Sequence, residues 1–462
     1  MNTDSSLEPG ILPGEQFERL RDRLEGRIAL PSDDDWDEQR RAWQLLADQH
    51  PSAVVVAAGV QDVVETVTFA RRFGLRVAPQ STGHGAGALP SLAETILLRT
   101  SALGGVDVDR FTGRARAGAG AVWGDVAAAA AEHGLAAVAG MSSTVGVVGL
   151  ALGGGLGWLA RSHGLAADSI VAIEGVDAQS RVIRADADQH ADLLWAARGG
   201  VAPVIVTAIE LQLHPIAELW AGGMLWAIDR TADVVHAWRE WIADVPDSVT
   251  SLARVLRYPP LPELPESLRG RAFVAIEVAV QESGDDVEDL LAPLRALEPD
   301  IDSVRTMSPA ELAGVHGDPP QPAPAYGDAV VLTEISPASA DAFVAAALAP
   351  ASTPLVSIEL RQLGGMLTPG RATGGAVSTI DGAGLVYVVG IVPVPEALEP
   401  VRAATAEVIG RLAAFASTRA VKTFSERPIG ADALYGDAAE QVRRVAAAWD
   451  PQGIVRSAHP LR

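Results

Sequence analysis

The sequence predicts an α+β protein of two domains, and three observations support this prediction. The chain has 462 residues, 48% of them hydrophobic, so it can bury a large core. Strand and helix patterns alternate from about residue 49 to 215, which favours an α/β unit. A composition change after His214-Pro215 introduces strands, helices and proline-rich stretches, which favours a second, α+β domain. We therefore expect an arm at 1–48, domains at 49–215 and 216–418, and a C-terminal segment at 419–462.

The elements of the first domain follow from local patterns. Short apolar runs predict strands, a helical period predicts helices, and glycine after the last periodic residue predicts where a helix ends. In order, we expect a helix around Glu15–Glu25, a strand at Ala53–Ala57, a helix at Val60–Phe73 ended by Gly74, strands at Leu75–Ala78 and Arg114–Gly118, a helix at Val122–Glu132, a hairpin of Ile170–Val176 with Arg181–Ala185, and a strand at Val204–Leu213.

The second domain is expected to contain strands separated by helices and by proline-rich stretches. The strand candidates are Trp220–Ile228, Ala272–Val280, Val356–Leu363 and Leu385–Val392, and the C-terminal segment ends in an amphipathic helix near Ala438–Ala448.

Charge and cysteine content exclude several classes of protein. The net charge of -22, with no local block of basic residues, argues against binding to nucleic acid or to an anionic membrane. The absence of cysteine excludes disulfides and thiolate chemistry and fits a reducing compartment. Met1–Gly10 contains no basic region followed by an apolar one, so we expect no signal peptide and a cytoplasmic location.

A long uncharged stretch, Gly134–Ala160, exceeds the roughly 20 residues that cross a bilayer. Its many glycines, together with Ser142, Ser143 and Thr144, would leave backbone groups unsatisfied in lipid. We therefore interpret the stretch as a buried cradle for a cofactor and expect no membrane span.

His84 is the most informative residue of the chain. It lies among small residues just after a predicted strand, and two glycine-rich loops, Ser81–Gly87 and Gly140–Gly157, occur in the same domain. Glycine lets backbone N–H groups approach an anion closely, so these loops predict a site for a long, anionic and electrophilic cofactor. Judged on its loop alone, His84 could equally well cap a turn.

The sequence gives only weak support for a Rossmann dinucleotide site, a lysine Schiff base or a metal site. The run Gly153–Ala160 matches the G-x-G-x-x-A dinucleotide pattern, but only Trp158–His163 precedes the next glycine, whereas a Rossmann turn should begin a helix of ten or more residues. Lys422 is the only lysine, so a Schiff base has one candidate. No H-E-x-x-H or other metal motif is present, and no metal is expected.

The ordered motifs resemble those of the FAD-dependent oxidases related to vanillyl-alcohol oxidase and p-cresol methylhydroxylase (PCMH), within the berberine-bridge-enzyme-like branch. The resemblance covers nearly the whole chain. It rests on Ser81–Gly85, Val145–Gly157, Arg161–Asp168, Asp192–Gly200, Glu359–Gly365, and the tail from Tyr435–Asp437 to Trp449–Pro451.

The resemblance implies a two-domain, PCMH-type FAD-binding fold. The N-terminal unit and the C-terminal segment would bind FAD together, and a central antiparallel sheet would cover the flavin and form the substrate pocket. His84 matches the histidine that is bonded to the flavin 8α-carbon, where a neutral imidazole adds to the quinone-methide tautomer. Residues assigned to the cofactor are Ser81, Thr82, Gly83, His84, Gly85, Ala86, Ser142, Ser143, Val145, Gly146, Gly149, Gly155 and Val206.

Two of these positions bear on the chemistry of the flavin. Ser142 stands where some relatives carry a second flavin-linking cysteine, so at most one covalent bond is expected. Val145 matches a position where valine is associated with oxygen access, which favours an oxidase over a dehydrogenase.

The chain departs from the family pattern twice. The family's G-G-N-F-G run is replaced by Gly199–Val204. The tail motif Y-x-N-Y, which often supplies a tyrosine base, cannot be recognised in Val421–Glu426. Catalytic candidates are therefore taken from the central sheet: Glu359 and Arg361 on one strand face and Tyr387 on another strand. Glu359 is the first choice as base or substrate orienter, with a pKa raised by an apolar cavity, and a structural pair of Glu359 with Arg361 is an equally open interpretation.

The predicted function is an FAD-dependent oxidase. It would take a hydride from a C–H bond next to oxygen or nitrogen of a small-molecule substrate and pass the electrons to O2, giving H2O2, as in the tailoring of secondary metabolites. The alternatives are a flavin-retaining binding protein with little turnover, and a dehydrogenase that uses another acceptor or a nicotinamide cofactor. The sequence indicates neither the substrate nor the oligomeric state.

Overall fold

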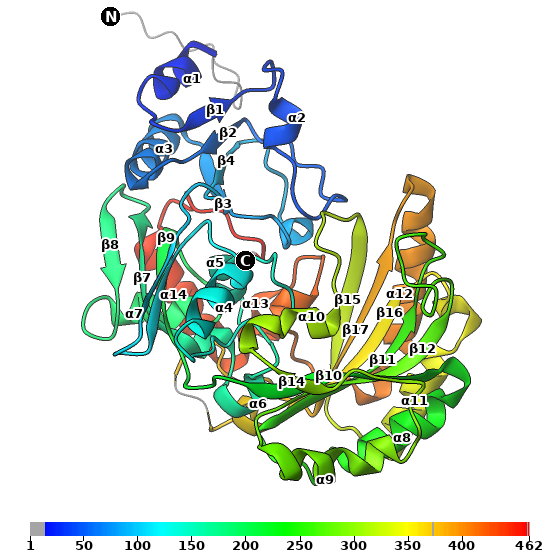
Figure 1. The fold of residues 1–462 in the computed structure, drawn as a ribbon. Helices are drawn as coiled ribbons and strands as arrows, with labels where there is room; N and C mark the ends of the chain where they lie inside the picture. The colour runs from blue at the N-terminus through cyan, green and yellow to red at the C-terminus, as the bar shows by residue number, and fades with distance from the viewer. Residues whose placement is uncertain (1–13, 372–373, 460, 462) are drawn as a thin grey trace, which may run out of the picture.

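The computed structural model describes residues 14–371, 374–459 and 461. The expectation about Met1–Gly10 lies outside the described residues. In Figure 1 the N-terminal half of the chain, in blue and cyan, lies above and to the left of a large sheet in green and yellow. The chain is a mixture of helices and sheets, as the sequence predicts.

The first sheet carries His84 at the end of one of its strands. Its strands follow the order β1 (Arg27–Ala29), β2 (Ala53–Val56), β4 (Thr95–Arg99) and β3 (Arg76–Gln80), and the last three are parallel. Two helices, α1 (Gly14–Arg21) and α3 (Val60–Phe73), accompany this sheet, and short α2 spans Trp36–Gln39.

The helix α3 has the bounds that the sequence predicts. It buries Val63, Val67 and Ala70 on one face, at the spacing of a helix that packs on a sheet. It ends at Gly74, whose φ of 71° is the left-handed conformation that glycine adopts most easily at a helix terminus.

The second sheet is antiparallel and completes the N-terminal half. Its order is β5 (Val106–Asp109), β6 (Arg114–Gly118), β9 (Val204–Gln212), β7 (Ile170–Asp177) and β8 (Val182–Ala185). The predicted hairpin is confirmed as the pair β7 and β8. Helices α4 (Trp123–Ala131), α5 (Val147–Leu152), α6 (Ala160–His163) and α7 (Ala191–Ala197) belong to this half.

The third sheet is the predicted antiparallel sheet of the second domain. Along its main path the order is β13 (Ile301–Asp302), β10 (Leu219–Ala227), β12 (Ala272–Val280), β11 (Val249–Arg257), β16 (Ser357–Gln362), β17 (Gly384–Ile391) and β15 (Ala325–Leu332), and β14 (Arg305–Met307) pairs with β10. The sequence reading did not assign β11 and β15. Eight of the nine β11 residues are buried, so no alternating pattern marks it, and β15 follows a proline-rich stretch.

The two faces of the third sheet have different partners. Helices α8 (Thr231–Trp241), α9 (Gly284–Arg295), α11 (Pro337–Ala347) and α12 (Leu398–Arg411) cover the outer face. The inner face packs on the N-terminal half through Leu252, Val331 and Leu385. Successive side chains of a strand point to opposite faces, so the odd-numbered residues of β16 and β17 face the N-terminal half.

The C-terminal segment returns to the N-terminal half, as the sequence predicts. Val77 in β3 donates its N–H to the Ile454 carbonyl at 2.7 Å, and its own carbonyl accepts from the Arg456 N–H at 2.8 Å. Helices α13 (Ala431–Tyr435) and α14 (Ala439–Trp449) pack in one apolar cluster with Ala196 of α7. The residue numbers assigned to the domain boundaries stay a prediction.

No helix within residues 14–371 and 374–459 is long and apolar enough to cross a membrane. The uncharged stretch Gly134–Ala160 contains one helix, α5, of six residues, between irregular loops.

The return of the C-terminal segment is expected to be essential for stability. Ile454 is 5% exposed within the core of the first sheet, and Ile454→Ala should destabilise the protein by about 2–4 kcal/mol because it leaves a cavity there. The measurement is the urea midpoint of unfolding. Leu261→Ala, at a side chain that is 51% exposed, is the control and should shift stability by less than about 0.5 kcal/mol. Equal effects of the two substitutions would contradict this role of the segment.

Candidate functional site

The His84 imidazole is held on both of its nitrogens. Its Nδ1 lies 2.8 Å from the Thr82 hydroxyl, and its Nε2 lies 3.3 Å from the Thr144 hydroxyl. Thr82 and His84 follow β3, whereas Thr144 belongs to the second glycine-rich loop. Burial lowers the pKa of His84 to about 4, so the ring is neutral at physiological pH and one nitrogen carries a lone pair instead of a proton.

Trp43 covers one face of this imidazole. The two ring centroids are 3.9 Å apart, and the ring planes differ by 17°. The sequence reading missed Trp43, because it lies in the segment taken as an arm and no local pattern relates it to a residue 41 positions later.

The two glycine-rich loops meet beside His84. A Cβ on Gly146 would lie 3.1 Å from both Cβ and Oγ of Ser81, so glycine allows the loops to approach closely without displacing the Ser81 side chain. The Ser81 hydroxyl is buried without a hydrogen-bond partner. Gly85 and Gly149 are exposed, with open space where a side chain would stand.

These features fit a dinucleotide cofactor. The loops contain backbone amides, an unpaired hydroxyl, and glycines with empty space beside them. These groups can bind a diphosphate even though the loops carry no basic side chain. No group of three or more potential metal ligands occurs in the described part of the chain. The Rossmann interpretation of Gly153–Gly157 is wrong, because this run follows the helix α5 rather than a strand and precedes a helix of four residues.

The remaining cofactor candidates lie around these loops in varied environments. Ser142 and Thr144 place their hydroxyls 3.3 Å apart, Ser143 is exposed, and Val145 is half-buried against the core of the N-terminal half. Gly83 adopts a φ of 86°, and Ala86 is buried in a short 3-10 turn. Gly155 is buried against Ala166, and Val206 is buried in β9. Their roles in cofactor binding stay predictions.

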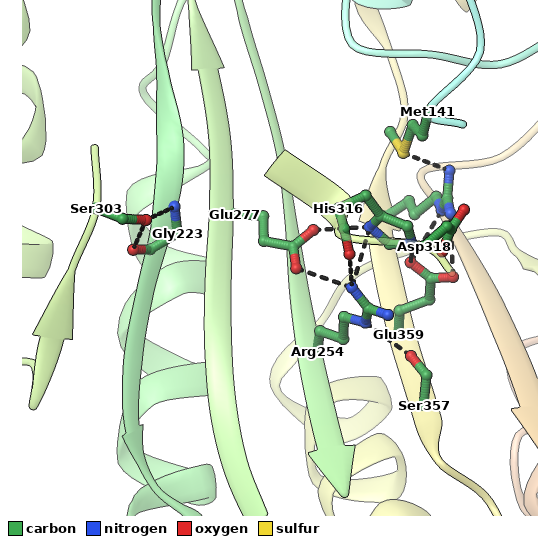
Figure 2. Close-up of polar contacts among 10 residues, drawn as sticks. Met141, Gly223, Arg254, Glu277, Ser303, His316, Asp318, Ser357 and Glu359 are labelled. Atoms are coloured by element: carbon green, nitrogen blue, oxygen red, sulfur yellow. Dashed lines mark hydrogen bonds and ion pairs between the residues drawn. The ribbon is translucent and has the colours of Figure 1, made fainter. Parts of the chain in front are cut away.

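The inner face of the third sheet buries a network of charges. Arg254 on β11 donates to Glu277 on β12 at 2.9 Å, and it also donates to the His316 carbonyl and to the Ser357 hydroxyl. His316 ends the short helix α10 (Ala313–His316), and its Nδ1 is 2.8 Å from Glu277. Figure 2 shows His316 between Glu277 and Glu359, which come from two strands of the sheet. The sequence reading missed Arg254, Glu277 and His316.

Glu359 and Arg361 form a buried ion pair with two hydrogen bonds, of 3.0 and 3.2 Å. The Arg361 guanidinium also lies 2.8 Å from the Met141 sulfur and 4.7 Å from the centre of the Phe424 ring. Arg361 thus joins the sheet to the second glycine-rich loop and to the C-terminal segment. The structural pair that the sequence left open is present, and it stands at the junction of all three parts.

The expectation of a raised pKa for Glu359 is wrong. Burial alone would raise the pKa of this carboxyl, but the positive charges of Arg361, His316 and Arg254 together outweigh it and lower the pKa. Glu359 is therefore held as a carboxylate that already binds a guanidinium. This is a poor arrangement for accepting a proton from a substrate.

Tyr387 lies next to this pair. It is directly opposite Glu359 in the pairing of β16 and β17, and its ring meets the Phe424 ring edge-on at 5.2 Å. Burial, followed by the negative charges of Glu426, Glu359 and Asp318, raises the pKa of the phenol. Tyr387 is therefore a neutral hydroxyl that can donate a hydrogen bond to a substrate.

Glu426 is a second carboxyl at this junction. Its Oε2 accepts from the Gln44 amide at 3.2 Å, and it packs so closely on Gly87 that a Cβ there would lie 2.3 Å from this oxygen. Burial is the main cause that raises the pKa of Glu426 to about 7. The only sequence signal for Glu426 was its position in the altered tail motif.

The altered tail motif contacts the segment that precedes the other departure. The Lys422 ammonium, in the altered tail motif, donates at 2.6 Å to the carbonyl of Gly200, the residue directly before the altered Val201–Pro203. Burial lowers the pKa of Lys422 to about 8. This hydrogen bond ties the C-terminal segment to the N-terminal half.

Comparisons with known proteins agree with this geometry. Residues 51–186 match the family described as FAD binding domain. The chain is 34% identical over 206 residues to (R)-6-hydroxynicotine oxidase of Paenarthrobacter nicotinovorans, a match that covers 44% of this chain and 45% of that protein. The chain spans about half the length of the curated relatives it matches.

Similarity to solved structures extends over nearly the whole chain. Physcomitrella patens BBE-like 1 matches with a TM-score of 0.82 and 19% identity, over 96% of this chain and 99% of that one. The 6-hydroxy-D-nicotine oxidase of Arthrobacter nicotinovorans matches with a TM-score of 0.79 and 24% identity, over 93% and 96% of the two chains. The fold is therefore the one that the sequence motifs predict.

Loss of one charge from the buried network should strongly lower the free energy of unfolding. Glu277→Gln keeps the shape of the side chain but leaves Arg254 without its full counter-charge, so we expect a destabilisation of about 3–5 kcal/mol in urea unfolding. The pKa of Glu277 is lowered in the folded protein, because the nearby positive charges outweigh burial. The stabilisation is therefore present above the ordinary pKa of 4.5 and is lost as the pH falls through the folded-state pKa.

The matched control is Glu288→Gln, which removes one charge of the exposed pair with Arg295 and should cost at most about 1 kcal/mol. An unchanged midpoint for Glu277→Gln would contradict the network's role in stability.

Proposed function

We propose that this chain, which belongs to the vanillyl-alcohol oxidase and p-cresol methylhydroxylase superfamily in its berberine-bridge-enzyme-like branch, is an FAD-dependent oxidase. The observation that carries the proposal is the neutral His84 imidazole, held between two hydroxyls where two glycine-rich loops meet. Bound FAD would accept a hydride from the substrate and pass two electrons to O2, giving H2O2.

The cofactor would be attached once. The lone pair of a neutral imidazole is the nucleophile that attachment to the flavin 8α-carbon needs, and the low pKa of His84 keeps that lone pair available. A second link is excluded at Ser142, because a serine cannot form the thioether that a cysteine forms. Backbone amides of the loop from Ser81 to Gly87 would bind the diphosphate.

The substrate would lie between the loops and the inner face of the third sheet. Arg361 is fixed there by Glu359, Met141 and Phe424, so it presents a rigid donor, and we assign the pair with Glu359 to orienting the substrate. The Tyr387 hydroxyl supplies a second polar contact. These two donors suit an alcohol or amine whose reactive C–H bond is next to oxygen or nitrogen.

The proton acceptor is assigned to Glu426 rather than to Glu359. Glu426 packs on Gly87, three residues beyond His84, whereas both oxygens of Glu359 already accept hydrogen bonds from Arg361. A carboxyl with a pKa of about 7 is half ionised at neutral pH and is well matched to general-base catalysis. The O–H or N–H proton of the substrate would pass to Glu426 as the hydride leaves, beside the Tyr387 hydroxyl.

Several finer points belong to the same proposal. Val145 favours O2 as the acceptor, and small molecules are proposed as substrates, without nucleic acid or membrane partners. A cytoplasmic role in tailoring secondary metabolites is also proposed. One observation favours a second candidate, a flavin-retaining protein with little turnover: Lys422, in the altered tail motif, binds the carbonyl of Gly200 directly before the altered residues Val201–Pro203.

Reduction of the purified, flavin-loaded chain tests the oxidase proposal. Anaerobic photoreduction followed by mixing with air should reoxidise the flavin rapidly and release H2O2, and a panel of alcohols, sugars and amines should contain compounds that reduce it. Slow reoxidation would instead favour a dehydrogenase with another acceptor. Rapid reoxidation with no reducing substrate in the panel would favour the flavin-retaining alternative.

The assignment of the base predicts a specific pH dependence. The rate of flavin reduction should rise with pH through about 7, because the raised pKa of Glu426 means that its carboxylate forms only above that range. Glu426→Gln should remove this rise and slow reduction by about 10²–10⁴-fold in stopped-flow measurements.

The matched comparison is Glu359→Gln, which should keep the rise near pH 7 while weakening substrate binding. If the rise persists in Glu426→Gln and disappears in Glu359→Gln, the two roles must be exchanged.

A further inference from the structure

Trp43 is the one aromatic residue among the described residues whose ring stacks on His84. The rings are nearly parallel, so the indole covers one face of the imidazole and does not block the ring nitrogens, which meet the Thr82 and Thr144 hydroxyls at the ring edge. The indole N–H is buried without a hydrogen-bond partner, so its packing surface, rather than a polar contact, is what this tryptophan contributes.

The backbone of Trp43 is fixed from two sides. Its N–H donates to the carbonyl of Thr82 at 3.0 Å, and its carbonyl accepts from the N–H of Ala323 at 3.2 Å. The N–H of Gln44 then donates to the carbonyl of Gly83. Residues 42–46 therefore form a strap that joins the His84 loop to the segment before β15, and these bonds fix the backbone that carries the indole beside the imidazole.

The strap also explains the tight packing behind His84. A Cβ on Gly83 would lie 2.9 Å from the Ala42 side chain, so the loop presses against the strap directly before the histidine. The Thr82 and Thr144 hydroxyls hold the imidazole edge, and the indole prevents the ring from turning about its Cβ–Cγ bond. The imidazole is thus restrained at its edge by two hydroxyls and on one face by the indole.

We propose that Trp43 is a positioning residue for the attachment of the flavin to His84, an inference that rests on the proposed function. In the attachment step, a bond forms between an imidazole nitrogen and the flavin 8α-carbon. The imidazole N–H proton and one proton of the 8-methyl group end on the flavin, which becomes reduced by two electrons. Dioxygen then takes these two electrons and two protons and leaves as H2O2.

The stack should act on the rate of attachment rather than on FAD affinity. Trp43 contacts the nucleophile, whereas the diphosphate is assigned to the loop amides. Aromatic pairs contribute about 0.5–1.5 kcal/mol, so loss of the stack should slow covalent attachment by about threefold to tenfold. The final amount of bound flavin should change little.

The test uses the full-length chain expressed under flavin limitation and then incubated with excess FAD. At successive times the chain is precipitated with acid, and the flavin that stays with it is measured by fluorescence. Trp43→Leu should attach flavin about threefold to tenfold more slowly than the native chain, and Trp43→Phe, which keeps an aromatic face, should attach it at nearly the native rate. Trp36→Leu is the control, because Trp36 packs on the separate cluster of Ala29, Val54 and Ala78.

The outcomes separate this inference from the proposed function. Attachment by Trp43→Leu at the native rate would overturn the role of Trp43 and leave the oxidase proposal intact. A native chain that binds FAD but never retains it in acid would overturn the covalent bond itself. If Trp43→Leu fails to fold by circular dichroism, Trp43→Met serves as the second non-aromatic variant, and a native rate for it would equally overturn the inference.

Discussion

The contact between the two glycine-rich loops, at Ser81 with Gly146 and at His84 with Thr144, is the constraint on which the rest of the site depends. Each loop is placed by a different part of the N-terminal half. The first leaves β3, and the second is tied to the start of α4 through the bridge between Val122 and Gly146. The loops therefore meet only when both sheets of this half are folded, and the cofactor site is a product of tertiary packing.

The third sheet completes the site at an energetic cost. Burying two arginines and two glutamates on its inner face is expensive unless each charge is paired and hydrogen-bonded, and apolar residues would stabilise the same face more simply. Arg254 pairs in this way with Glu277, and Arg361 with Glu359, while His316 lies 2.8 Å from Glu277 and 3.7 Å from Glu359. This arrangement holds Arg361 against the loop at Met141 and against the C-terminal segment at Phe424.

Much of the fold could be predicted because its signals are local. The period of Val60–Phe73, the glycine that ends it, and the motif order that indicates FAD binding are all readable along the chain. The strand β11 was not predicted because it is buried on both faces, so its side chains do not alternate between apolar and polar. The expected pKa of Glu359 was wrong for a related reason. A buried carboxylate titrates according to its neighbours, and two of these, Arg254 and His316, come from distant segments.

The site residues that could not be predicted from the sequence all come from segments far from His84 in the chain. Trp43, Gln44 and Glu426 reach the His84 loop from an N-terminal strap and a C-terminal segment, and Gln44 and Glu426 are 382 positions apart. No periodicity or spacing relates such residues, because only the return of the chain over the first sheet brings them together. By contrast, His84 could be recognised because a histidine among glycines after a strand is a local feature with a chemical meaning.

The central claim is that His84 carries the flavin between the two loops. Its most direct test is mass spectrometry of proteolytic fragments from the purified, full-length chain. We expect the fragment containing His84 to carry the added mass of FAD, and the fragment containing Ser142 to carry none. Flavin attached to any other fragment, or a His84 fragment of unmodified mass from a chain saturated with FAD, would contradict the account.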